Sequence, residues 1–229
     1  MTINNNNIFG AFTLGEVRSG RLTGDWLNKE SVANYGWFGG GTTPGPTLVS
    51  RVDRIDFSND SPSALVRGSL SQARRGLSAT GNSNYGWFGG GSIPTPAVVS
   101  TVDRIDFSND SVSASPRGPL SSARFGSGAT SGQAKGPAIK LQKTGNYGWF
   151  GGGNLGTFVT TVDRIDFSND SPTASVRGSL SLARSNLAAT GNSNYGWFGG
   201  GFGASATPIV DRIDFSNDST TASIRGPLS

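Results

Sequence analysis

The sequence predicts an all-β protein made of four similar units, each with four short antiparallel strands. Two blocks of residues recur four times, and each has the composition of a strand that ends in a turn. The first block is Asn-Tyr-Gly-Trp-Phe-Gly-Gly-Gly, and its copies begin at Asn34, Asn84, Asn146 and Asn194. The 229 residues include 35 glycines and 11 prolines, a composition that suits strands and tight turns better than helices.

The first block predicts sheets that are covered on both faces. In an extended chain Tyr35 and Trp37 point to one face and Phe38 to the other. Sheets that stack around an axis bury both faces and leave only short edges, which is the arrangement of a β-propeller. Successive tyrosines are 50, 62 and 48 residues apart, a period typical of propeller blades. We expect the repeated aromatic residues to be structural: Tyr35, Trp37, Tyr85, Trp87, Tyr147, Trp149, Tyr195 and Trp197.

The units follow one another from the N-terminus. Residues 1–19 are expected to form an N-terminal extension or edge strand, and they carry no recognisable secretory signal. Residues 20–229 are expected to form the propeller. Its four blades of four antiparallel strands are predicted over about 20–67, 70–117, 120–177 and 180–226. Five blades are the alternative, if residues 8–20 help to build another one.

The second block, Val-Asp-Arg-Ile-Asp-Phe-Ser-Asn-Asp-Ser, predicts a strand that closes in an Asx-rich turn. Its copies begin at Val52, Val102, Val162 and Val210. A short strand ending in Arg-Gly comes next, followed in complete units by Leu-Ser-x-Ala-Arg and a strand of small residues. Each unit therefore supplies the four strands of one blade.

These residues resemble the kelch repeat. The matching pattern in the last complete unit is Leu180-Ser181-Leu182-Ala183-Arg184, 187–190, Gly191-Asn192, Tyr195, Trp197-Phe198 and Gly199-Gly200. The resemblance covers about residues 20–229 and implies a kelch-like β-propeller. It departs at the last strand, where kelch units carry a tryptophan and this chain has small residues near Ala114 and Ala174.

The amino-acid sequences of both blocks also resemble tandem repeats in virion or tail-associated proteins of cyanophages and other marine phages. That resemblance implies a structural or host-attachment role, with other virion proteins or surface glycans as partners. It implies a location in the virion, with the cytoplasm as the alternative.

Composition argues against several classes of function. The chain has no cysteine and no histidine, which removes thiolate metal sites and the commonest general base. The net charge of +4 comes from balanced repeats plus one mildly basic insertion, so we expect no nucleic-acid partner. No apolar stretch approaches the ~20 residues that span a bilayer, so no membrane insertion is expected. We expect a non-enzymatic protein with no catalytic residue, cofactor or metal ion.

Two motifs have a chemical and a structural interpretation. Residues 151–156 satisfy G-x-G-x-x-G, but a β-branched strand candidate follows where a dinucleotide site needs a helix, so we interpret them as a turn. The aspartates recur as Asp-x-x-Asp-x-x-x-Asp, as in Asp103, Asp106 and Asp110. Their fourfold repetition, with an arginine for each in its own unit, favours ion pairs and turn caps. Calcium binding is the alternative.

Candidate binding residues lie in the basic positions and in the loops that differ between units. Arg74, Arg124 and Arg184 are candidates for a ring that holds acidic peptides or sugar acids, as kelch-like binders do; inter-blade salt bridges are the alternative. The loops 42–51, 92–101, 154–161 and 202–209 are dissimilar, and function tends to lie on such loops. Insertion 125–145 is either a finger that contacts a neighbouring subunit or a tolerated surface loop, and it carries Lys135, Lys140 and Lys143. A lectin-like, carbohydrate-binding propeller is the second hypothesis, and an enzyme is the third.

Overall fold

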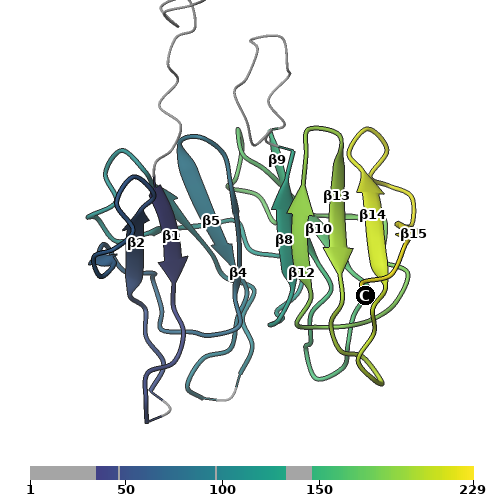
Figure 1. Cartoon of the computed structure of the whole chain (residues 1–229), viewed down its shortest axis with the longest axis horizontal. Coiled ribbons are helices and arrows are strands. Elements are labelled where there is room, and N and C mark those ends of the chain that lie inside the picture. The colour runs from purple at the N-terminus through teal and green to yellow at the C-terminus, as the bar shows by residue number, and fades with distance from the viewer. Residues whose placement is uncertain (1–34, 46, 96, 133–145) are drawn as a thin grey trace, which may run out of the picture. The chain divides into compact units, whose positions relative to one another are not determined.

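The computed structural model describes residues 35–45, 47–95, 97–132 and 146–229, all within the unit Tyr35–Ser229. These residues form only strands, turns and loops, so the all-β prediction is confirmed (Figure 1). The predicted N-terminal extension, the first strand of the first blade and the fifth-blade alternative lie outside the described residues.

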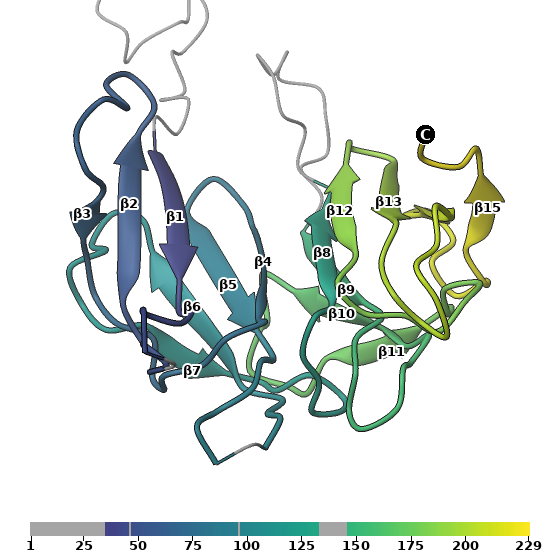
Figure 2. The same cartoon turned by 60° about the horizontal axis from the view of Figure 1, so that its bottom comes forward.

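The strands form four antiparallel sheets. The first sheet contains β1 (Tyr35–Gly39), β2 (Val52–Asp56) and β3 (Leu65–Val66), and the second contains β4 (Ser78–Gly81), β5 (Tyr85–Gly89), β6 (Val102–Asp106) and β7 (Ser115–Arg117). The third sheet contains β8 (Gly128–Ser131), β9 (Tyr147–Gly151), β10 (Val162–Asp166) and β11 (Ser175–Arg177). The fourth contains β12 (Ala188–Gly191), β13 (Tyr195–Gly199), β14 (Val210–Asp214) and β15 (Ser223–Arg225). Figure 2 shows the strands of each sheet side by side in chain order.

Every sheet has the same register and therefore the same two faces. Tyr35 pairs with Asp56 and Trp37 with Arg54, and the equivalent pairs recur in the other three sheets. Because side chains alternate along a strand, tyrosine, tryptophan, arginine and the first valine of the second block share one face, called here the tryptophan face. The phenylalanine of the first block and the isoleucine and phenylalanine of the second block share the other face, called here the phenylalanine face.

The core lies between the sheets, where the tryptophan face of one packs on the phenylalanine face of the next. The junction of the second and third sheets buries Trp87 and Val102 against Phe150 and Ile165. The equivalent residues form a separate core at each of the other two junctions. The sheets are thus two-sided and stacked, as the aromatic block predicts.

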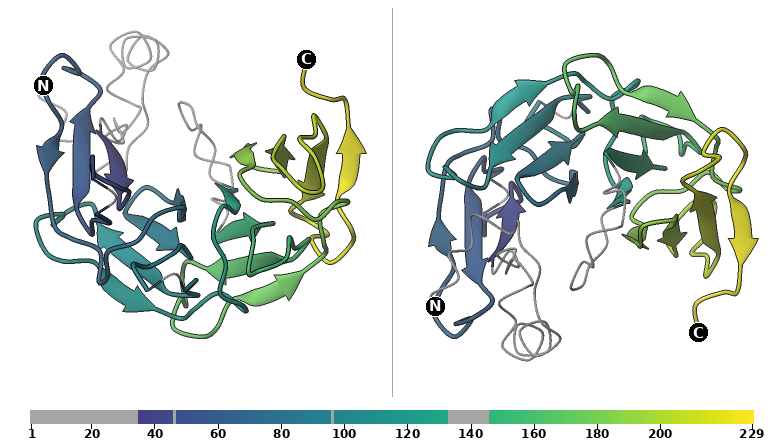
Figure 3. Two further views of the ribbon diagram at one scale, coloured as in Figure 1. Left: turned by 90° about the horizontal axis from the view of Figure 1, so that it is seen from below. Right: turned by 90° about the horizontal axis from the view of Figure 1, so that it is seen from above.

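The four sheets do not close into a ring. Among the described residues, no buried cluster joins the fourth sheet to the first. In Figure 3 the first sheet (purple) and the fourth sheet (yellow) lie at opposite ends of the series. Because the same junction recurs between every pair, each step turns the sheet by a similar amount, and four sheets fall short of a full turn. The closed four-bladed circle expected from four repeats is not formed by these sheets alone.

The three glycines at the end of each first block allow the next repeat to approach. Gly40 has φ +69°, and a Cβ there would lie 2.4 Å from the carbonyl oxygen of Arg74. The amide of Gly41 donates to that same oxygen over 2.9 Å. A side chain at this turn would push consecutive repeats apart, which is why only glycine fits.

Candidate functional site

The three candidate binding arginines are buried in ion pairs. Arg74, Arg124 and Arg184 have no exposed side-chain surface, and each guanidinium lies 2.8–2.9 Å from an aspartate that is equally buried. The aspartates are Asp103, Asp163 and Asp211. The bond joins the Leu-Ser-x-Ala-Arg segment to the second block of the same repeat, so it is an ion pair within a blade and not between blades. A ligand has no access to these guanidinium groups, which counts against the predicted binding ring.

Arg124 illustrates how the pair is built. Its guanidinium donates to the Asp163 carboxylate over 2.8 Å and to the carbonyl oxygen of Phe150 over 3.2 Å. The amide of Ser121 donates to the same carboxylate oxygen over 2.9 Å. Burial lowers the pKa of Arg124, and the facing carboxylate opposes that shift. This ion pair and its hydrogen bonds join the segment before each sheet to the two central strands of that sheet.

The last aspartate of each motif joins two sheets. Trp87 Nε1 donates to the carboxylate of Asp170 over 2.8 Å, and the guanidinium of Arg104 lies 3.0 Å from the same oxygen. The indole ring of Trp87 also stacks on Phe167, with ring centroids 4.1 Å apart. The same three contacts recur at the other two junctions. The prediction that each aspartate pairs with an arginine of its own unit is therefore wrong for this position, because the partner lies in the preceding unit.

The middle aspartate of the motif caps a turn. Asp106 accepts hydrogen bonds from the amide and the hydroxyl of Ser108, over 2.9 and 2.6 Å. These bonds hold the pKa of Asp106 below its usual value of 3.8, chiefly through the hydroxyl. Asp56 and Asp214 have the same contacts, and these lower the pKa of both carboxyl groups in the same way. The turn-cap prediction is confirmed, and among the described residues no three acidic side chains lie close enough together to hold a metal ion.

The repeated tyrosines support the tryptophans. The guanidinium of Arg104 lies 4.4 Å from the ring centroid of Tyr85, and Trp87 packs edge-on against that ring. The three side chains come from adjacent positions on β5 and β6 and recur in every sheet. The tyrosine therefore holds the arginine that reaches the next sheet.

The dissimilar loops leave the sheets after the glycines. Ser92 forms bridges both with Val98, within its own loop, and with Arg75, in the segment that leads into the same sheet. Equivalent double bridges hold the loops of the third and fourth sheets. The loops that follow β1, β5 and β13 leave their sheets on the same side, at the bottom of Figure 1. Their bases are fixed by backbone bonds while their tips differ in sequence.

One aromatic contact distinguishes the loops of the third and fourth sheets. The rings of Phe158 and Phe202 meet edge to face, with centroids 6.0 Å apart. Phe202 is 49% exposed and Leu155 is 42% exposed. The G-x-G-x-x-G motif at 151–156 lies here, and it leads through a bridge between Asn154 and Phe158 into β10. This confirms the interpretation of the motif as a turn.

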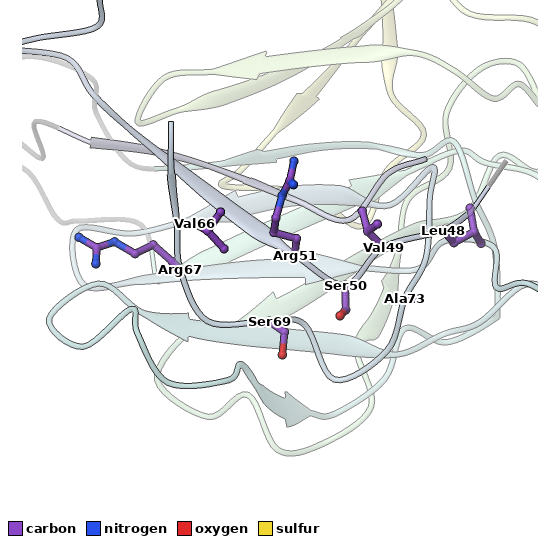
Figure 4. Close-up of a pocket in the computed structure, with 8 residues that line it drawn as sticks. All are labelled: Leu48, Val49, Ser50, Arg51, Val66, Arg67, Ser69 and Ala73. Atoms are coloured by element: carbon purple, nitrogen blue, oxygen red, sulfur yellow. The ribbon is translucent and has the colours of Figure 1, made fainter. Parts of the chain in front are cut away.

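A shallow surface depression lies beside the first sheet (Figure 4). Its walls come from the end of the first dissimilar loop, from β3 and from the segment after it. The lining residues are Leu48, Val49, Ser50, Arg51, Val66, Arg67, Ser69 and Ala73. Its charged lining residues are Arg51, which bonds to Asp53 over 2.9 Å at the surface, and Arg67, so the lining holds no pair of groups suited to acid–base catalysis.

Lys135, Lys140 and Lys143 lie outside the described residues, so their predicted binding role stays a prediction. In the part of the chain that the structure describes, no helix has the length and apolar character that crossing a membrane requires. The chain matches no protein-family model, and no curated protein is significantly similar to it.

Proposed function

We propose that this chain is a non-enzymatic structural protein, a kelch-like propeller-type stack of sheets that presents its dissimilar loops to partners. The observation that supports this most is that the charged residues that recur in the repeats are used for structure. Within the second, third and fourth repeats, the recurring aspartates are engaged in turn caps, buried ion pairs or inter-sheet junctions, whereas Asp53 of the first repeat forms a surface ion pair. What varies between repeats is the loop tips, and binding residues tend to lie on loops that a rigid frame positions.

The similarity of the repeats to tandem repeats of phage virion and tail-associated proteins supports a role in a virus particle, in contact with other virion proteins or with the host surface. The test is to identify a phage whose genome carries this gene and to analyse its purified particles by mass spectrometry. The proposal requires the chain in intact particles at a copy number comparable with known tail components. Recovery from infected-cell extract alone, with none in washed particles, would refute the virion role.

A carbohydrate-binding role is the second candidate, and the half-exposed side chain of Phe202 beside Phe158 favours it, because sugar rings bind to exposed aromatic side chains. The test is a glycan array with the intact chain and with Phe202→Ala. Val176→Ala is the matched control, since Val176 is also exposed, at 59%, but lies on β11, away from the loops. Binding that Phe202→Ala removes and Val176→Ala keeps would support a lectin; an array with no signal would exclude it.

A further inference from the structure

The two ends of the sheet series carry the two halves of an unmade junction. On the first sheet, the phenylalanine face is open: Phe38 is 61% exposed, whereas its equivalents Phe88, Phe150 and Phe198 are at most 3% exposed. On the fourth sheet, the tryptophan face is open. Trp197 Nε1 has no acceptor among the described residues, whereas the other three indoles each donate to an aspartate of the following sheet.

The open face of the first sheet already has the geometry of a junction. Phe57 is 63% exposed, yet its ring lies over Gly36, where an added Cβ would be 2.7 Å from the ring. Phe107 lies over Gly86 in the same way, and Phe107 is the ring on which Trp37 stacks. Phe57 therefore lies in the position on which an indole stacks at the internal junctions, and no indole among the described residues stacks on it. Asp60 stands at the position that Asp110, Asp170 and Asp218 occupy in later repeats.

The open face of the fourth sheet lacks the matching main-chain contacts. At the internal junctions, the Arg-Gly amide donates to the backbone of the next repeat: Gly68 to Asp110, Gly118 to Asp170 and Gly178 to Asp218, each over 2.8 Å. A Cβ on these glycines would lie 1.8–2.0 Å from a carbonyl oxygen of the next repeat. Gly226 is their equivalent, and a Cβ there would meet no atom within 4 Å.

We propose that the tryptophan face of the fourth sheet binds the phenylalanine face of the first sheet in a second copy of this chain. The occupant is a second copy because a contact is made three times within the chain, and its two halves lie at opposite ends of the series without a partner among the described residues. Trp197 stacks on the partner's Phe57 and donates to the partner's Asp60, which also pairs with Arg212, as Arg54 pairs with Asp110. The Gly226 amide donates to the partner's Asp60 carbonyl oxygen.

Such a contact is head-to-tail, so it joins copies into a ring or, where the rotation does not close, into a filament. It goes beyond the proposed function, because the faces that it uses are separate from the loops. A variant that no longer self-associates can still be tested for partner binding by its loops. A chain whose loops bind no partner can still be tested for self-association.

The first test is sedimentation velocity of the full chain over a range of concentrations, with Gly226→Ala as the main variant. Its methyl group has free space in the single chain but strikes the partner, so the association constant should fall about tenfold or more while the unfolding midpoint stays unchanged. Phe38→Arg should weaken association at least as much. Val176→Arg is the matched control, with similar exposure on an internal sheet, and should associate like the unaltered chain.

The second test exchanges the charges of the junction. Asp60→Arg and Arg212→Asp should each weaken self-association, and mixing the two variants should restore it, because each mixed junction again pairs opposite charges. An unaltered chain that stays monomeric at its highest soluble concentration would overturn the proposal. This holds whether the two faces are then covered by the N-terminal residues of the same chain or by contact with each other. Association that Gly226→Ala and Phe38→Arg leave unchanged would overturn it equally.

Discussion

Replacing Arg124 by methionine tests whether the buried ion pairs hold the repeats together. Methionine fills most of the space of the arginine stem but leaves the Asp163 carboxylate without its cation, with the Ser121 amide as its remaining hydrogen-bond donor. Both side chains have no exposed surface, so water does not replace the lost partner. Removing one member of a fully buried pair costs about 3–5 kcal/mol of the free energy of unfolding. For a unit of this size, that lowers the midpoint of thermal unfolding by about 6–20 °C.

The assay is urea denaturation followed by tryptophan fluorescence, with Arg124→Met, Asp163→Asn and the double variant in one thermodynamic cycle. The double variant should be less destabilised than the sum of the single variants, with a coupling energy of about 1–3 kcal/mol. Arg74→Met and Arg184→Met repeat the measurement in neighbouring units. If Arg124→Met lowers the free energy of unfolding by less than about 1 kcal/mol, or if the effects of the two single variants are additive, the ion pair does not stabilise the fold as its burial indicates.

Three further outcomes follow from the junctions and turns. Gly118→Ala should lower the unfolding midpoint strongly, because its Cβ would lie 1.9 Å from the carbonyl oxygen of Pro172; a fully stable variant, measured by calorimetry, would contradict this. Ser108→Ala should raise the pKa of Asp106 toward its usual 3.8, as measured by NMR titration. Because the folded-state pKa is the lower one, this cap stabilises the fold above the unfolded-state pKa and the effect disappears as pH falls through the folded-state pKa, so the variant should differ most from the parent near neutral pH. Trp87→Phe removes an indole donor to the next sheet and should cost about 1–3 kcal/mol in urea denaturation, whereas no change would refute the junction as a source of stability.

The local structure could be predicted from the sequence because each element depends on its own residues. Alternation along the aromatic block gives two-sided strands, and the Asp-Phe-Ser sequence gives the capped turn at Asp106. The partner of Asp170 could not be predicted, because a repeat pattern does not state whether a contact is made within a unit or with its neighbour. A tryptophan and an aspartate that recur with the same period are a signal for such a contact. Only the packing of one sheet on the next shows which aspartate each tryptophan reaches.

Burial and closure depend on the packing of whole sheets. Arg124 has the sequence character of a surface residue, and only the approach of the Leu-Ser-x-Ala-Arg segment to β10 encloses it. The number of sheets needed for a full circle depends on the rotation between neighbouring sheets. The number of repeats in the sequence does not determine that rotation. The dissimilar loops stand out in the sequence, whereas the contact between Phe158 and Phe202 requires adjacent sheets to be placed.

The junctions have a direction, since Trp37, Trp87 and Trp149 each donate to an aspartate of the repeat that follows in the chain. During synthesis on the ribosome, a sheet can therefore complete its cover only when about 50 more residues have emerged. Assembly then proceeds in the order of translation, one repeat closing over its predecessor. Until the fourth repeat is made, the nascent chain carries one uncovered indole-bearing surface, and the next repeat to be synthesised is the one that covers it.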